Sequence, residues 1–223
     1  MKKFKCRASA LGQLMTNSRS KSEPMGETAK SLIREIWIKD NFGREQVINS
    51  KYMTKGNECE EDSMSLYTKV TNHLVVKNEL HFNNEWLTGT PDIVTADGII
   101  DIKTSWSIWT FANAGMTKDY EYQLRSYMML CDKPKAELAY CLVDTPPQMV
   151  SDELYRMHFN YIGGDANPQY DKDAEQVQKN MTFSDIDPKL RVKRFTLERD
   201  LQIEEQIKER VKIAREYYNN LTL

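Results

Sequence analysis

Residues 89–104 have the sequence GTPDIVTADGIIDIKT, and this stretch decides the fold. Two β-prone runs flank Asp97-Gly98, a pair that is typical of a two-residue type I′ turn because both turn positions need positive φ. The stretch therefore predicts a β-hairpin. With the turn at this pair, Asp92 lies opposite Lys103 on the neighbouring strand.

The second strand of this hairpin alternates charged and apolar side chains. Asp101 lies on the same face as Lys103 and diagonal to Asp92, whereas Ile100 and Ile102 face a core. Diagonal Cβ atoms are roughly 7 Å apart, so two carboxylates can bind one hard cation at bond lengths of about 2.1 Å. The alternative is a solvated hairpin edge with an ordinary Asp–Lys ion pair, which contributes little stability.

A helix over residues 57–72 provides a third carboxylate. Its buried arc consists of Cys59, Ser63, Leu66, Tyr67 and Val70. Glu60 lies at the edge of this arc, whereas Glu58, Glu61 and Asp62 point away. An inward carboxylate needs a partner, because an unpaired buried charge is costly. A metal ion shared with the hairpin is one candidate, and a nearby Lys or Arg is the other.

A further helix over residues 118–131 has Gln123 at the rim of its apolar arc. Tyr127 lies one turn away, so we expect the tyrosine to support an amide that points into a site. Before this helix come Trp106, Trp109 and Phe111. Such aromatic rings can stack on bases, but packing in a core or a subunit contact is their more common use.

The remaining pattern completes an order of helix, strands, acidic hairpin, helix and strand. We expect helices at 27–41, 147–159 and 199–220, and strands at 73–82, 86–88, 136–143 and 192–197. This order predicts an α/β fold with an α-β-β-β-α-β core, that is, a small mixed sheet flanked by helices. At 223 residues we expect a single domain, 1–223, with a loop or insertion at about 145–190.

Composition indicates a soluble globular protein, with 40% hydrophobic and 29% charged residues. No apolar run approaches a membrane span and no signal peptide is evident, so we expect no membrane association and a cytoplasmic location. The net charge of −2 argues against a broad basic coat for nucleic acid. Local basic residues could still hold phosphates: Lys2, Lys3, Lys5, Arg7, Arg19 and Lys21.

The cysteines and histidines do not predict a metal site. The four cysteines Cys6, Cys59, Cys131 and Cys141 are scattered without a Cys-x-x-Cys pair, which favours reduced thiols over an iron–sulfur cluster. The three histidines, His73, His81 and His158, have no ligand spacing, so we expect surface or packing roles for them.

Five ordered motifs resemble those of one enzyme family. They are Arg7-Ala8-Ser9, the Gly-x-x-x-Glu run Gly56–Glu60, Pro91-Asp92, Asp101-Ile102-Lys103, and the Gln-x-x-x-Tyr run Gln123–Tyr127. Together they resemble the PD-(D/E)XK nucleases, and within that superfamily the phage lambda exonuclease and YqaJ group of viral recombination nucleases. The likeness extends from about residue 6 to residue 143, with a weaker likeness in the C-terminal strand and helix.

The resemblance implies a catalytic set of Glu60, Asp92, Asp101, Lys103 and Gln123. It implies that Glu60, Asp92, Asp101 and the Ile102 carbonyl bind Mg²⁺, for which Mn²⁺ can substitute. It implies that Ser9, with Arg7 and Tyr127, contacts DNA at a 5′-phosphate. It further implies a trimeric ring around duplex DNA and pairing with a single-strand annealing recombinase.

The sequence thus favours a Mg²⁺-dependent exonuclease that degrades linear double-stranded DNA from 5′ to 3′ for phage-type recombination. The first alternative keeps the chemistry but changes the task, to a structure-specific or site-specific endonuclease or a RecB-like repair nuclease. The second alternative is a noncatalytic DNA-binding protein on a nuclease fold. That alternative predicts loss of the lysine or of a carboxylate, and here all four positions are filled.

Overall fold

The computed structural model describes residues 3–20, 22–47, 50–161 and 166–223, so Lys2 and Lys21 lie outside it. Its helices are η1 (Ala8–Ala10), α1 (Leu11–Leu14), α2 (Glu27–Phe42), α3 (Lys51–Glu58), α4 (Glu60–Thr71), α5 (Ile108–Ala112), α6 (Lys118–Cys131), α7 (Pro147–His158), α8 (Pro168–Met181), η3 (Pro188–Leu190) and α9 (Leu201–Asn219). Its strands are β1 (Cys6–Arg7), β2 (Phe82–Asn83), β3 (Leu87–Gly89), β4 (Ile93–Val94), β5 (Ile99–Thr104), β6 (Lys135–Cys141) and β7 (Val192–Glu198).

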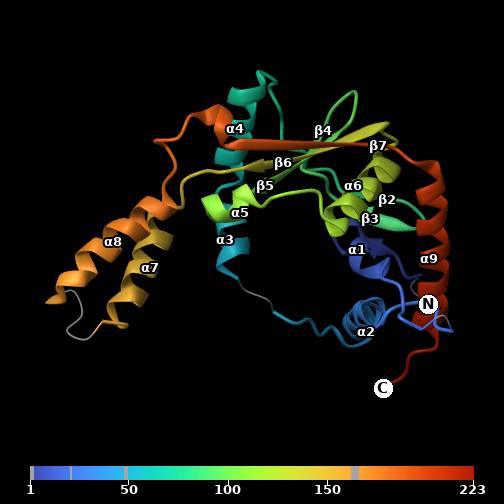
Figure 1. The fold of residues 1–223 in the computed structure, drawn as a ribbon. Coiled ribbons are helices and arrows are strands. Elements are labelled where there is room, and N and C mark those ends of the chain that lie inside the picture. The colour runs from blue at the N-terminus through green and yellow to red at the C-terminus, as the bar shows by residue number, and fades with distance from the viewer. Residues whose placement is uncertain (1–2, 21, 48–49, 162–165) are drawn as a thin grey trace.

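The central sheet has four strands in the order β4-β5-β6-β7 (Figure 1). β4 and β7 are antiparallel to their neighbours, and β5 is parallel to β6. β6 is buried from Ala136 to Cys141, as expected for a central strand covered on both faces. This mixed sheet with flanking helices confirms the predicted fold class.

Successive side chains of β6 pack alternately against two different helices, α6 and α4. Leu138 and Tyr140 pack in one apolar cluster with Leu124 and other α6 side chains. Ala139 and Cys141 pack in another with α4 side chains. Because successive side chains of a strand point to opposite faces, α6 and α4 cover opposite faces of the sheet. The catalytic candidates on α4, β5 and α6 are positioned by this sandwich.

A second, smaller sheet has the order β1-β3-β2, with β1 parallel and β2 antiparallel to β3. It belongs to a third apolar cluster, which joins the N-terminal segment and α2 to α9. The predicted strand at 86–88 is present as β3. It belongs to this smaller sheet, whereas the hairpin strands β4 and β5 belong to the central sheet. Of the predicted strand at 73–82, only Phe82 is in a strand, and residues 73–81 cross the molecule as an irregular segment.

The predicted hairpin forms, but its register is different. Ile93 pairs with Ile100 and Val94 with Ile99. Continued by one residue, this register places Asp101, and not the predicted Lys103, opposite Asp92. Within the described ranges, Gly43 is the one glycine with positive φ, so no type I′ turn is centred on Asp97-Gly98. The predicted turn type was wrong because Gly98 is needed for a close backbone contact and not for a positive φ. A Cβ atom at this position would lie 2.7 Å from the Lys135 carbonyl oxygen.

The helix predictions were mostly confirmed, and residues 145–190 hold more structure than expected. The predicted helix at 57–72 begins earlier and is divided into α3 and α4. The region predicted as a loop or insertion contains α8 in addition to α7. These two helices pack together as an arm that projects from the body (Figure 1). Within the described residues, no helix is both long and apolar enough to cross a membrane.

Candidate active site

β5 brings Asp101 and Lys103 together on one face of the sheet. Asp101 is only 1% exposed, and its Oδ2 atom lies 2.7 Å from Lys103 Nζ. Apart from this ion pair, Oδ2 accepts no hydrogen bond within the part of the chain that the structure describes. Burial lowers the pKa of Lys103, but the charges of Asp101 and Asp92 outweigh this effect and the net pKa is raised. The lysine is therefore held as an ammonium group.

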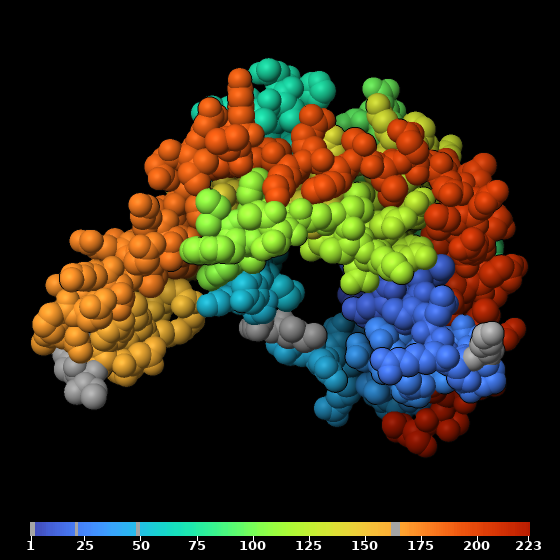
Figure 2. Space-filling view, viewed as in Figure 1, coloured from blue at the N-terminus to red at the C-terminus, as the bar shows by residue number. Residues whose placement is uncertain are grey.

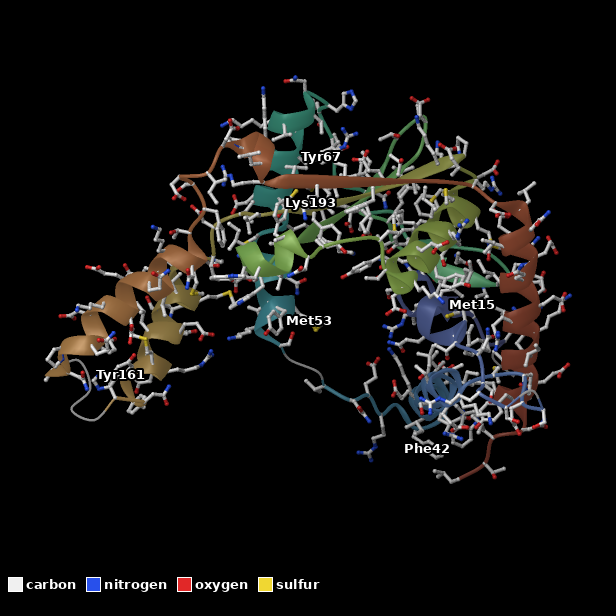
Figure 3. The ribbon with its side chains drawn as sticks, viewed as in Figure 1. Met15, Phe42, Met53, Tyr67, Tyr161 and Lys193 are labelled. Carbon is white, nitrogen blue, oxygen red and sulfur yellow. The ribbon has the colours of Figure 1, made fainter. Side chains whose placement is uncertain are left out.

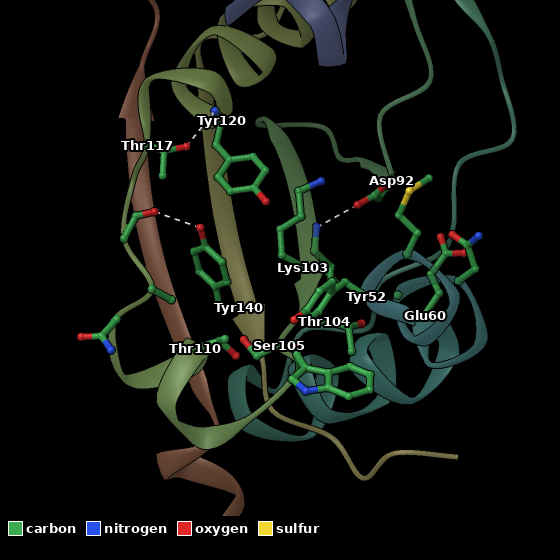
Figure 4. A pocket seen from close by; sticks show the side chains of 18 residues that line it. Tyr52, Glu60, Asp92, Lys103, Thr104, Ser105, Thr110, Thr117, Tyr120 and Tyr140 are labelled. Carbon is green, nitrogen blue, oxygen red and sulfur yellow. Dashed lines mark hydrogen bonds between the residues drawn. The ribbon is translucent and has the colours of Figure 1, made fainter. Parts of the chain in front are cut away.

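Asp92 precedes β4 and turns its carboxylate toward β5. Its Oδ2 atom accepts a hydrogen bond of 2.8 Å from the Ile102 backbone N–H (Figure 4). Burial, reinforced by the negative charge of Asp101, raises the pKa of Asp92 to about 6. Burial also raises the pKa of Asp101. Two adjacent carboxylates with raised pKa values form a site that favours a positive charge.

Gln123 on α6 holds Asp101 from the opposite side. Its Nε2 atom donates to Asp101 Oδ1 at 3.2 Å and to the Tyr127 hydroxyl oxygen at 3.1 Å. Tyr127 therefore supports the amide, as the helical spacing predicted. The glutamine steadies the carboxylate of Asp101.

Glu60 begins α4 and is half-buried, while Glu58, Glu61 and Asp62 are exposed as expected. It contributes to the negative potential that raises the pKa of Asp92. Its Oε2 atom nevertheless accepts a hydrogen bond from Lys77, in the irregular segment 73–81. Of the two partners that the sequence allowed, the carboxylate contacts the lysine in this conformation.

These side chains border a cavity of about 650 Å³, which we call the active-site cavity. Its lining includes Glu60, Asp92, Ile102 and Lys103. Figure 4 shows Lys103 between the Tyr120 ring and Asp92, and the ammonium group lies 5.3 Å from the centre of that ring. On the face shown in Figure 2 the surface is hollowed between α3, α6 and α2. Met53, which also lines the cavity, points into this opening (Figure 3).

A second cavity of about 410 Å³, which we call the end cavity, contains the three predicted DNA-contacting residues. Arg7, Ser9 and Tyr127 line it together with His81, Thr88 and Thr90. His81 contacts both threonine hydroxyls, at 2.9 Å to Thr90 Oγ1 and 2.6 Å to Thr88 Oγ1. Because Tyr127 also contacts Gln123, a chain of hydrogen bonds connects the end cavity to Asp101.

Some lining residues were missed in the sequence. Tyr120 was assigned only to an apolar arc, although its position one turn before Gln123 was a usable signal. His81 was assigned a surface or packing role, and no spacing signal marks it. The four cysteines are free thiols, three of them buried, which agrees with the prediction of reduced core thiols.

No ready-made metal centre is present in the described ranges, where no group of three or more His, Cys, Asp or Glu side chains is arranged to hold an ion. Asp92 and Asp101 are together, and the third predicted carboxylate, Glu60, is directed to Lys77. The structure therefore brings together Asp92, Asp101, Lys103 and Gln123. It places Glu60 on the wall of the same cavity.

Comparison with solved structures shows similarity over almost the whole chain. A phage-related exonuclease from Haemophilus somnus 129PT is 27% identical, with 97% of this chain and 94% of that chain covered at a TM-score of 0.76. The alkaline exonuclease LHK-Exo from Laribacter hongkongensis is 14% identical, with 96% and 88% covered at a TM-score of 0.65. Its complex with dAMP gives a TM-score of 0.62. No protein-family model and no curated protein matches the chain.

These similarities confirm the resemblance that the five motifs indicated. Solved structures that share this fold include a phage-related exonuclease and an alkaline exonuclease.

Proposed function

We propose that this chain, which shares the fold of the lambda exonuclease and YqaJ group, is a Mg²⁺-dependent exonuclease that degrades linear double-stranded DNA from 5′ to 3′. The observation that carries the proposal is the convergence of Asp92, Asp101, Lys103 and Gln123, of which Asp92 and Lys103 line the active-site cavity and the buried Asp101 contacts both Lys103 and Gln123. These residues come from β5, from α6 and from the segment that precedes β4. The exonuclease neighbours support the same reaction class.

The residues present fit a hard divalent cation. Asp101 Oδ2 is buried with only the Lys103 ammonium group against it, and Asp92 lies beside it as a second carboxylate. Within an extended strand the N–H and C=O of one residue point to the same edge. Since the Ile102 N–H points to Asp92, the Ile102 carbonyl faces the same side and can serve as a further ligand.

Asp92, Asp101 and the Ile102 carbonyl would hold Mg²⁺, or Mn²⁺ in its place, and Glu60 would join them after leaving Lys77. When bound, the ion supplies Lewis-acid activation of a water molecule and stabilisation of charge on the phosphate and the leaving 3′ oxygen. Carboxylate and carbonyl oxygens are the ligands that such ions prefer.

The protein's own groups do the remaining work. Lys103 lies at the cavity wall, where its ammonium group can orient the attacking water and offset negative charge that develops on the phosphate. Gln123 fixes the orientation of Asp101, and Tyr127 fixes Gln123. Tyr120 restricts the position of Lys103.

The end cavity supports the 5′ to 3′ direction. Arg7 and Ser9 are exposed at its wall, and a guanidinium group and a hydroxyl are suitable donors to a terminal phosphate. A 5′-phosphate bound there would place the next phosphodiester toward Asp92 and Asp101. The recombination role, the trimeric ring and the annealing recombinase as partner are carried over to this chain from the resemblance.

The experiment is degradation of end-labelled linear duplex DNA by the wild type and by Lys103→Ala. We expect cleavage with Mg²⁺ and none with a chelator. We expect Lys103→Ala to cleave about a hundredfold more slowly or worse and still to bind DNA, because the lysine is one of many contacts. Full activity of this variant would remove Lys103 from the mechanism.

Two substrate comparisons separate the proposal from its alternatives. Closed-circular DNA should remain intact, whereas an endonuclease would cut it. Linear DNA with a 5′-phosphate should be degraded faster than DNA with a 5′-hydroxyl, and the preference should weaken in Ser9→Ala. Binding without any cleavage under all these conditions would favour the noncatalytic alternative.

A further inference from the structure

A third cavity, of about 410 Å³, lies between the arm formed by α7 and α8 and the body of the protein. We call it the arm cavity. Its lining includes Lys51, Trp106, Trp109, Arg156, Asn160 and Asn180. Trp106 also lines the active-site cavity, so the two cavities meet at this residue. The arm cavity therefore adjoins the active-site cavity, which holds the catalytic candidates.

The aromatic side chains at this junction are unusually exposed. Trp109, which lines the arm cavity, is 57% exposed, and Tyr52 and Met53, which line the adjoining active-site cavity, are exposed as well. Single exposed apolar residues are common, but a group of large ones on neighbouring elements marks a contact surface. Of the three aromatic residues after the hairpin, Phe111 is buried as packing predicts, whereas Trp109 is free to stack.

The backbone that carries Trp109 is held in place by hydrogen bonds at the start of its helix. Trp109 lies in α5, whose first turn is held by reciprocal hydrogen bonds between Ser107 and Thr110. Trp106 is held by the hydrogen bond from Lys55 to its backbone carbonyl oxygen and by an edge contact with the Tyr52 ring. An exposed indole ring on a fixed helical backbone is accessible to a flat ligand, and no backbone rearrangement is needed for stacking.

Charge at the arm cavity favours an anionic ligand by a small margin. Lys51 and Arg156 are the cations, and both contact Glu153, each at 2.8 Å. Two cations against one carboxylate leave one positive charge in this cluster. The Lys51 ammonium group also lies 4.9 Å from the centre of the Trp106 ring. Asn160 and Asn180 add amide groups that can hydrogen-bond base edges.

We propose that the arm cavity binds single-stranded DNA next to the scissile phosphate, with a base stacked on Trp109 and a phosphate near Lys51 and Arg156. This inference rests on the proposed function for the identity of the ligand. An aromatic platform beside a basic group is the combination that single-strand-binding proteins use, and it tolerates any base sequence.

The test measures binding of a fluorescent oligothymidylate and of a blunt duplex, in chelator so that no hydrolysis occurs. Trp109→Ala should weaken oligothymidylate binding about tenfold, the effect of losing one stacked base. Blunt-duplex binding should stay within about twofold of the wild type. Trp109→Phe, which retains an aromatic face, should recover most of the affinity and shows that the loss reflects stacking.

Tyr155→Ala is the matched control, because Tyr155 is an exposed aromatic residue of the same arm that does not line the arm cavity. It should bind oligothymidylate as the wild type does. Unchanged affinity in Trp109→Ala, or an equal loss in Tyr155→Ala, would overturn the inference. If the wild type hydrolyses no DNA but Trp109→Ala loses affinity, the proposed function fails and the binding site stands. If hydrolysis occurs and Trp109→Ala binds normally, only the binding site fails.

Discussion

Asp92 and Asp101 place two negative charges side by side in a buried setting. Burial raises the pKa of both carboxyl groups, and the charge of Asp101 raises the pKa of Asp92 further. Lys103 offsets only one charge, and the remaining charge favours a bound cation. Without that cation the pair destabilises the fold. The carboxylate pair thus lowers the stability of the metal-free protein, and the same pair enables the site to bind an ion.

Asp92→Asn should therefore be more stable than the wild type in chelator, by about 1–2 kcal/mol, because it removes the repulsion of Asp101. The asparagine oxygen still accepts the hydrogen bond from the Ile102 N–H. Urea unfolding with and without Mg²⁺ measures the difference. Mg²⁺ should stabilise the wild type but not Asp92→Asn, and this variant should not cleave DNA. A variant that is less stable in chelator would contradict this account of the carboxylate pair.

Much of the site could be predicted residue by residue. Strand alternation placed Asp101 and Lys103 on one face, and the helical wheel turned Glu60 inward, because both patterns depend on local geometry alone. The pairing of Glu60 with Lys77 could not be predicted. It depends on the path of segment 73–81, which was expected to be a strand and instead crosses the molecule irregularly.

At the level of secondary-structure elements, the sequence correctly located the turn of the hairpin at Gly98 but gave the wrong reason for the glycine. Gly98 marks the turn region, but it is required for close approach of the Lys135 backbone and not for positive φ. The Lys135 carbonyl belongs to β6, which lies 37 or more residues further along the chain. A local turn preference cannot report such a contact, so the register was predicted wrongly and Asp92 was placed opposite Lys103.

Lys55 joins three elements at the base of the arm. It is 1% exposed, donates a 3.1 Å hydrogen bond from α3 to the Trp106 carbonyl oxygen, and lies 5.2 Å from the Phe183 ring centre. Burial lowers its pKa to about 8, and the charges of Cys59 and Asp144 oppose this effect only in part. The lysine thus positions the loop between β5 and α5 at a cost in stability.

Lys55→Met should raise the free energy of unfolding by about 1–3 kcal/mol near neutral pH, because no charge is then buried. Between about pH 8 and pH 10.5 the unfolded wild type binds a proton that the folded wild type has lost, so wild-type stability rises with pH. The advantage of Lys55→Met should therefore shrink across this window and vanish above it. Urea unfolding at several pH values measures the change.

Lys69→Met is the control for Lys55→Met, because Lys69 is exposed on α4 and its replacement should leave stability unchanged at every pH. Lower stability of Lys55→Met throughout the range would mean that the hydrogen bond to Trp106 outweighs the burial of charge. If Lys55→Met is more stable than the wild type but binds oligothymidylate more weakly, the hydrogen bond of Lys55 holds the Trp106 loop in the position needed for binding.

At the scale of the whole molecule, one chain exposes more surface than a compact protein of its size. Its accessible surface is 13677 Å², whereas a compact monomer of this mass exposes roughly 10,600 Å². The projecting arm and the hollow of Figure 2 account for part of the roughly 3,000 Å² of excess. Segment 73–81 adds three exposed apolar side chains, Leu74, Val76 and Leu80.

An excess of this size is enough for one or two protein interfaces, each of which buries about 800 Å² per partner. We therefore expect the trimer that the resemblance implies, with a mass by multi-angle light scattering of about three times 26.1 kDa. Because association depends on concentration, specific activity on long DNA should fall on dilution together with the mass. A single-chain mass at micromolar concentration, with full activity on linear DNA, would show that one chain suffices and that the excess surface contacts DNA alone.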